Sequence, residues 1–178
     1  KGDAVILGVS NNMWFTSVIT GKSIAGIRAG DIIRLRMLLS KIEGVEEIYG
    51  FARKEMTSVL LYAAAFDQKI SRIALIEPYS SYRSIVMNRY YYTGFVHNFV
   101  AGALTEYDLP DLAATLAPRK LMMNGTSDGN GDKSDNDNIE RDLVVIKNSY
   151  KAKNAENQLI IKADTSENHY DILMDWMK

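Results

Sequence analysis

The sequence predicts an α/β fold in three layers, with a mainly parallel sheet of about five strands between layers of helices. Short apolar runs of strand length alternate with longer segments of helical period along the 178 residues. Such alternation is typical of parallel strands joined by crossover helices, which cover both faces of the sheet. The length suits one domain, residues 1–178, and no internal repeat divides it.

The first third of the chain predicts two strands around a helix. Residues 4–9, AVILGV, form a buried strand that follows Gly2 and precedes a polar Ser-Asn-Asn stretch. Residues 26–41 predict an amphipathic helix with its arginines on the polar face and its apolar residues on one broad side. Gly44 ends this helix, and residues 45–51 predict a second strand. The apolar side chains of the helix are Ile27, Ile32, Ile33, Leu35, Met37, Leu38 and Leu39.

The middle of the chain predicts a helix over 56–66 and a third strand over 72–77. Pro78 ends that strand, since proline has no amide hydrogen for a sheet ladder. The stretch from 79 to 110 is rich in tyrosine and has no regular period.

The last third predicts two more strands. Residues 109–116 indicate a short helix with Pro110 in its first turn, and residues 119–125 indicate the fourth strand. A polar loop rich in Gly, Asp and Asn spans 128–138. The remaining elements are a helix over 139–153, a fifth strand over 157–163 and a closing helix over 170–178.

Composition excludes several classes of function. A net charge of −1 and a pI near 6.2 predict neither a nucleic-acid partner nor an anionic membrane surface. The chain has no apolar run long enough for a transmembrane helix. The absence of cysteine excludes disulfides, thiol catalysis and cysteine-ligated metal, and no motif indicates another metal or a cofactor. Because the chain opens directly on strand-like residues, we expect it to be the C-terminal part of a longer protein.

Three loops that follow predicted strands carry the candidate site residues. In parallel sheets, ligands bind at the carboxyl ends of the strands. The first loop is the turn after residue 51, the second begins with Ser127 and Asp128, and the third ends at His169. A histidine that acts as a general base needs a carboxylate to hold its tautomer, and these loops offer both groups.

Three stretches of this sequence resemble a known family. They are YAAAFDQKISRIALIEPYSSYRSIV, YDLPDLAATLAPRKLMMNG and NHYDIL. They are similar to the C-terminal half of acetylxylan-esterase-like α/β-hydrolases, a group of carbohydrate esterases and their relatives, and the resemblance runs from about residue 4 to the end.

The resemblance implies an α/β-hydrolase-like fold that lacks its N-terminal strands and its oxyanion-hole loop. It implies an acylated carbohydrate as substrate or ligand, and a periplasmic or secreted location. By position, the family's catalytic acid falls on Asp128 and its histidine on His169. The order turn, acid, histidine is the order of the catalytic residues in that fold.

The nucleophile position of this pattern holds no serine. Members of the family place the nucleophile between small residues on a strained strand-to-helix turn. Counting back from AAAFD puts Ala52 and Met56 at the small positions and Lys54 at the nucleophile. Counting forward from Gly50 puts Ala52 at the nucleophile instead. Ser58 is the nearest hydroxyl, and it falls inside the predicted helix.

Each candidate residue also has a structural interpretation. His169 alone is a surface histidine, Asp128 alone is a turn residue, and Lys54 alone is an exposed residue at a helix start. The acidic loop has EF-hand-like spacing, but Lys133 and Ile139 occupy the glycine and glutamate positions, so a solvated loop is favoured over calcium. The aromatic residues of the irregular stretch form a sugar-stacking wall or a core cover. They are Tyr79, Tyr82, Tyr90, Tyr91, Tyr92 and Phe95.

Two functions remain open on these residues. The first is a carbohydrate ester hydrolase with His169 as base and Asp128 as its orienting acid, its nucleophile supplied by Ser58, by another segment or by an activated water. The second is a non-catalytic hydrolase-fold module of a larger polysaccharide-processing protein. In both cases the uncovered first strand is expected to pair with another chain, as a homo-oligomer, or with a missing N-terminal half.

Overall fold

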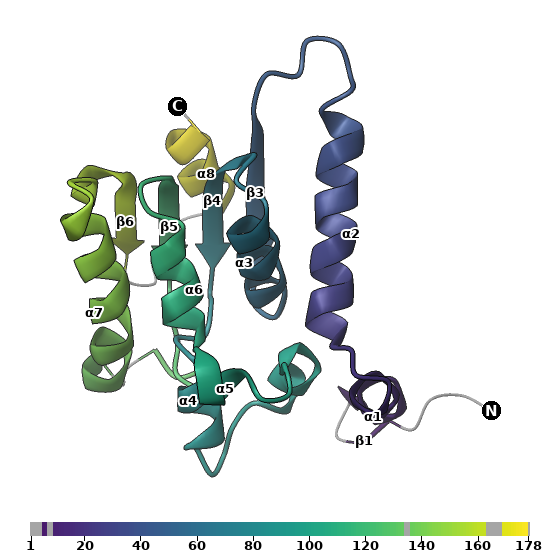
Figure 1. The fold of residues 1–178 in the computed structure, drawn as a ribbon. Coiled ribbons are helices and arrows are strands. Elements are labelled where there is room, and N and C mark those ends of the chain that lie inside the picture. The colour runs from purple at the N-terminus through teal and green to yellow at the C-terminus, as the bar shows by residue number, and fades with distance from the viewer. Residues whose placement is uncertain (1–4, 7–8, 134–135, 163–168, 178) are drawn as a thin grey trace.

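A computed structural model describes residues 5–6, 9–133, 136–162 and 169–177. Its main sheet has four strands, all parallel, in the order β3–β4–β5–β6 (Figure 1). The prediction of an α/β fold with a parallel sheet is therefore confirmed, with four strands in the sheet over the described residues. The strands are β3 (Ile48–Arg53), β4 (Ile70–Ile76), β5 (Lys120–Asn124) and β6 (Leu159–Lys162).

The strand predicted over residues 4–9 does not join this sheet. The structure describes β1 (Val5–Ile6) and β2 (Val9–Ser10), which pair with each other in antiparallel orientation as a separate two-stranded unit. This part of the five-strand prediction is wrong for the described residues. A six-residue apolar run specifies extended backbone, but which partner it pairs with depends on tertiary contacts that the run itself does not encode.

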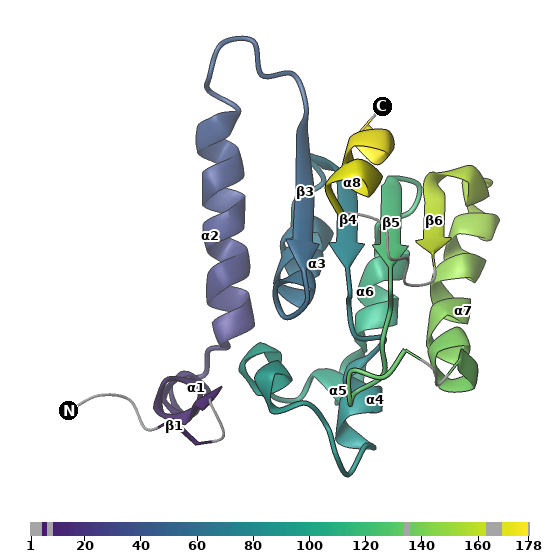
Figure 2. The ribbon, with the colours of Figure 1, turned by 180° about the vertical axis from the view of Figure 1, so that it is seen from behind.

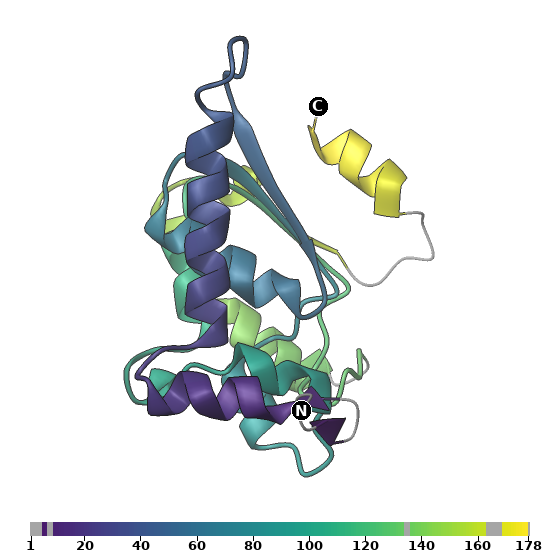
Figure 3. The ribbon, with the colours of Figure 1, turned by 90° about the vertical axis from the view of Figure 1, so that its right-hand side faces the viewer.

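Helices cover both faces of the sheet, as predicted. The crossover helices pack on one face, and the C-terminal helix lies on the other (Figure 3). Figure 2 shows the strands from the side opposite the crossover helices. The crossover helices are α3 (Met56–Phe66), α6 (Leu109–Thr115) and α7 (Asn136–Ala152), and the C-terminal helix is α8 (His169–Met177).

The core divides between these two faces. The larger cluster lies between the sheet and the crossover helices and includes Val59, Leu75, Leu121 and Tyr150. The smaller cluster lies under α8, and its members are Ala74, Ile76, Met122, Ile172 and Trp176. Alternate residues of β4 and β5 enter opposite clusters, as the two-residue period of a strand requires.

Helix α3 begins and ends at the predicted residues, 56 and 66. It is buried along most of its length, because the sheet lies on one side of it and α2 and α6 on the others. Gly50 of β3 permits this close packing. A Cβ at Gly50 would lie 2.6 Å from Leu60 Cδ1, so a larger residue would push α3 off the strand.

Helix α2 (Ile24–Leu39) differs from its prediction in the face that it buries. Ser23 caps its N-terminus by accepting a hydrogen bond from the Gly26 amide at 2.9 Å. The residues buried along α2 are Ile24, Ala25 and Ala29, whereas five of the predicted apolar side are exposed: Ile27, Leu35, Met37, Leu38 and Leu39. Small side chains allow α2 to approach α3 closely, and Ile32 and Ile33 pack, partly buried, against the same core cluster.

Two further features of the N-terminal half were absent from the prediction. Helix α1 (Asn11–Ile19) precedes α2 where the sequence indicated only a polar stretch. Arg36 of α2 forms a buried ion pair with Asp67 at the end of α3, with Nη2 and Oδ2 2.6 Å apart. This ion pair joins the two helices at their C-terminal ends.

The irregular stretch 79–110 contains three short helices: α4 (Tyr82–Val86), η1 (Thr93–Asn98) and α5 (Ala103–Glu106). Residues 107–125, at the end of this stretch and after it, make contacts that fix α6 and the end of α3. Asp108 and Asp111 form a capping box at the start of α6. Arg119 donates hydrogen bonds to the carbonyls of Ala64, Asp67 and Ile70, and it thereby satisfies backbone groups around the end of α3.

No helix among the described residues is both long enough and apolar enough to cross a membrane.

Candidate functional site

The strands β3, β4 and β5 are parallel, so the residues that follow them meet at one edge of the sheet. A cavity of about 240 Å³ lies at this edge. It is lined by residues that follow all three strands together with two aromatic side chains of the irregular stretch. The lining residues are Lys54, Glu55, Glu77, Tyr92, Phe95, Ser127, Asn130, Gly131 and Lys133.

Lys54 forms the sharp turn between β3 and α3. Its φ angle is +51°, in the left-handed region that costs a non-glycine residue about 1–2 kcal/mol. The Lys54 amide donates to the Ile76 carbonyl at 2.9 Å, and its carbonyl accepts from the Thr57 amide at 3.0 Å. Strand and helix are therefore joined almost without a loop, and the exposed Lys54 side chain stands at the turn.

The other two residues considered for the nucleophile lie away from this turn. Ala52 is buried within β3 and faces the larger core cluster. Ser58 is buried in the first turn of α3, where its Oγ donates to the Glu55 carbonyl at 3.2 Å. A hydroxyl that is buried and bonded to its own helix does not face the cavity edge, so the structure places Lys54 alone of the three at the turn.

Glu77 is a site residue that sequence reasoning missed. It follows β4, also with a φ of +51°, and its carboxylate accepts hydrogen bonds from Arg53 Nε at 2.6 Å and Lys133 Nζ at 3.1 Å. Burial acts to raise the pKa of Glu77, but the hydrogen bonds and charges of Arg53 and Lys133 outweigh it, so the net pKa is lowered from 4.5. The available signal was an acid directly before Pro78 at a predicted strand end.

Asp128 is buried, and its carboxylate organises its own turn. Oδ1 accepts from the amides of Asn130 and Asp132, each at 2.8 Å, and Oδ2 accepts from Asn88 Nδ2 at 3.0 Å. Gly129 packs so closely on α4 that an added Cβ would lie 2.3 Å from the Ser84 carbonyl. The structural interpretation of Asp128 as a turn residue therefore accounts for the contacts of Oδ1, whereas Oδ2 binds Asn88 of the irregular stretch.

The same contacts bear on the calcium interpretation of this loop. The Asp128 oxygens that an EF-hand-like site would use accept backbone and amide hydrogens instead. Over the described part of the chain, no group of three His, Asp or Glu residues gathers in a way that could hold a metal ion.

His169 is the first residue of α8, on the sheet face opposite α3. Its side chain and residues 163–168 lie outside the described residues. The expected approach of His169 to Asp128 therefore stays a prediction.

The aromatic residues of the irregular stretch divide into two groups. Tyr79, Tyr82 and Phe95 are buried, and the rings of Tyr79 and Phe95 have centroids 4.2 Å apart. Burial raises the pKa of both Tyr79 and Tyr82, as expected for core phenols. Tyr90, Tyr91 and Tyr92 are exposed, and Tyr92 packs edge-on against Phe95 at 5.0 Å. The first group therefore covers the core. Phe95 of that group also forms a wall of the cavity together with Tyr92.

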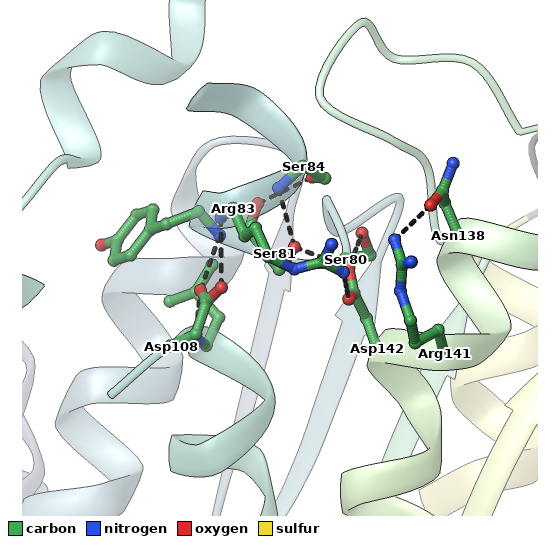
Figure 4. A network of polar contacts seen from close by, with 10 residues as sticks. Ser80, Ser81, Arg83, Ser84, Asp108, Asn138, Arg141 and Asp142 are labelled. Carbon is green, nitrogen blue, oxygen red and sulfur yellow. Dashed lines mark hydrogen bonds and ion pairs between the residues drawn. The ribbon is translucent and has the colours of Figure 1, made fainter. Parts of the chain in front are cut away.

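A buried polar network holds the segment after β4 in place (Figure 4). The Asp142 carboxylate of α7 accepts from Ser80 Oγ at 2.7 Å and Ser81 Oγ at 2.6 Å, and it forms an ion pair with Arg83. Asp108 accepts from the amides of Tyr82 and Arg83 at 2.7 and 3.1 Å. The start of α4 is therefore fixed to both α6 and α7, and with it the segment that leads to Tyr92.

Comparisons with family models, with curated proteins and with solved structures find no match to this chain. The geometry of the site is therefore the basis for any assignment of function.

Proposed function

We propose that this chain is a non-catalytic binding module of the α/β-hydrolase type, which takes a small acylated carbohydrate in the cavity at the end of β3. The observation that carries the proposal is Lys54 at a positive φ of 51° on the strand-to-helix turn. A hydrolase of this type needs a hydroxyl, thiol or carboxylate at that turn. Burial is what frees a lysine amine for attack, and Lys54 is exposed.

The lining of the cavity supports a carbohydrate as the ligand. Glu77 and Lys133, already hydrogen-bonded to each other, contribute charged polar groups to the lining. Tyr92 and the largely buried Phe95 contribute aromatic surface. A pyranose ring offers hydroxyls to the first and C–H groups to the second, and a volume of about 240 Å³ suits one or two sugar units rather than a long chain.

A weak ester hydrolase is the second candidate. The sharp turn at Lys54 after β3 and the placement of Asp128 after β5 favour it, because both follow the order of the hydrolase triad. The contacts of Asp128 argue against it, since both carboxylate oxygens already accept hydrogen bonds from neighbouring groups. The binding module therefore accounts for more of the described contacts.

Titration calorimetry with acetylated xylo-oligosaccharides tests the proposal. Wild type is expected to bind saturably, and Tyr92→Ala is expected to weaken binding roughly fivefold, as loss of about 1 kcal/mol of aromatic contact implies. Tyr90→Ala is the matched control, because Tyr90 is 73% exposed in the same segment and does not line the cavity. No saturable binding, or equal losses in the two variants, would contradict the proposed site.

A further inference from the structure

The sheet has an open edge at β3. Strand β3 pairs with β4 on one side, and on its other side no strand of the described residues pairs with it. Helix α2 runs beside this edge, on the α3 side of the sheet, as Figures 1 and 3 together show. The backbone groups along one side of β3 are therefore available to a further strand.

An apolar groove of about 540 Å³ lies between α2 and β3. Its walls include side chains that a folded protein seldom leaves in water: Leu35 is 55% exposed, Phe51 46% and Met56 40%. Leu39 and Ile32 of α2 continue the same wall. Apolar surface beside an unpaired strand edge is the arrangement by which sheets accept an extended peptide.

We propose that this groove is a docking site for an extended segment of another polypeptide, which adds to the sheet as a strand parallel to β3. The helices α3, α6 and α7 lie on one face of the sheet and cover its parallel strands there. Helix α2 continues that layer past β3, so its apolar side covers the place of one more strand. A helix that leads into β3 on this face is placed as the crossover from a parallel neighbour.

The charges at the two ends of β3 indicate which charges the two ends of the partner strand carry. Glu46, just before the strand, is exposed, and so is Lys54, just after it. Glu47 and Arg53 are already paired with Arg72 and Glu77. A parallel partner therefore needs a basic residue at its start, apolar residues at alternate positions and an acidic residue at its end.

A second copy of the chain fits this edge less well. Pairing β3 with β3 about a twofold axis would make the two strands antiparallel and would put the α2 helices of both copies on the same face. That face beside β3 already holds α2 and α3, which pack against each other. A single extended strand needs no such space.

Binding of short synthetic peptides to the 178-residue chain tests the proposal. The parallel design, Lys-Lys-Val-Thr-Val-Thr-Val-Glu-Glu, is expected to bind with a Kd below about 1 mM. The reversed order, Glu-Glu-Val-Thr-Val-Thr-Val-Lys-Lys, and a version with proline in place of the central valine are expected to bind at least about tenfold more weakly. Failure of all three to bind, or equal binding by the proline version, would overturn the proposal.

Two substitutions on α2 locate the bound peptide. Leu35→Gln is expected to weaken binding of the parallel peptide about tenfold, because Leu35 lines the groove. Leu38→Gln, at 61% exposed on the same helix and outside the groove, is expected to leave binding unchanged. Equal effects of the two variants would contradict this location.

Sedimentation and hydrogen exchange distinguish a peptide partner from the two other possible occupants of the groove, which are a second copy of the chain and a segment of the chain itself. The free chain is expected to sediment as a monomer, with the outward amides of β3 exchanging rapidly until peptide is added. A concentration-dependent dimer broken by Leu35→Gln would assign the groove to a second copy instead. Slow exchange of the β3 amides in the free monomer would show that the chain covers its own edge.

Discussion

Lys54 combines two properties that rarely meet in one residue: a left-handed backbone and a long charged side chain. Left-handed geometry is tolerated where the neighbouring structure determines it. Here the Lys54 amide donates a hydrogen bond to the Ile76 carbonyl, and the Lys54 carbonyl accepts hydrogen bonds from the amide and hydroxyl of Thr57, so the turn is held on both sides. Such a turn projects one side chain above the sheet edge. In this chain the projected group is a lysine side chain, in place of the hydroxyl, thiol or carboxylate that an esterase nucleophile needs.

The strain at this turn is measurable through Lys54→Gly. Glycine adopts positive φ freely, so the substitution is expected to raise the free energy of unfolding by about 0.5–1 kcal/mol, after allowance for the greater freedom of glycine in the unfolded chain. Urea unfolding followed by circular dichroism measures the change. Lys69→Gly is the matched control, since Lys69 is an exposed turn residue without positive φ, and it is expected to lower stability. A loss of stability in Lys54→Gly would mean that the turn is not strained.

At the scale of residues, the sequence predicted positions better than contacts. Counting back from AAAFD placed Lys54 at the turn, because a regular helix transmits the register of its buried residues to its first turn. The hydrogen bond between Asp128 and Asn88 could not be predicted from the sequence. Asn88 comes from the irregular stretch, and nothing in the sequence indicates that its amide reaches the acidic loop.

Among the elements, α7 does more than cover the sheet. Its Asp142 lies beneath α4 and accepts hydrogen bonds from two serines and an arginine while only 5% exposed. A buried carboxylate with these partners is costly to remove, because the buried hydroxyls of Ser80 and Ser81 then lose their acceptor, whereas the 41% exposed side chain of Arg83 is reached by water.

Asp142→Ala is therefore expected to lower the free energy of unfolding by about 2–4 kcal/mol. Glu140→Ala, two residues away on the same helix, removes an exposed carboxylate paired with Lys147 and is expected to cost less than about 1 kcal/mol. Chemical unfolding of both variants under the same conditions provides the comparison. Equal costs would show that the Asp142 network does not hold the segment after β4.

The elements themselves were predicted with uneven success, for a physical reason. Helix α3 matched at both ends because its apolar run meets a polar turn on one side and Asp67 on the other. Helix α2 carries apolar residues around its circumference, so its sequence did not reveal that the two alanines form the contact. Helix α1 was missed because its Asn-Asn start was interpreted as a loop.

For the molecule as a whole, the parallel sheet and its helical layers place the cavity, the turn at Lys54 and the open edge at β3 close together. Arg53 connects the groove with the cavity, since it lines the groove and donates a hydrogen bond to Glu77 of the cavity. The first predicted strand, 4–9, could not be placed correctly, because the pairing of that segment depends on contacts outside it, whereas the fifth, 157–163, joins the sheet as β6. Strands β1 and β2 pair with each other, and no strand of the described residues occupies the outer edge of β3.

We propose that the site at the Lys54 turn binds an acylated ligand and does not cleave its ester. Hydrolysis of para-nitrophenyl acetate by wild type and by Ser58→Ala tests it most directly. Loss of the nucleophile in model hydrolases lowers the rate by about 10⁶, so both proteins are expected to hydrolyse the ester weakly or not at all, and at the same rate. Ser58 is buried and bonded within α3, and its removal should change nothing. Rapid turnover by wild type that Ser58→Ala abolishes would contradict the account and would identify the chain as a working serine esterase.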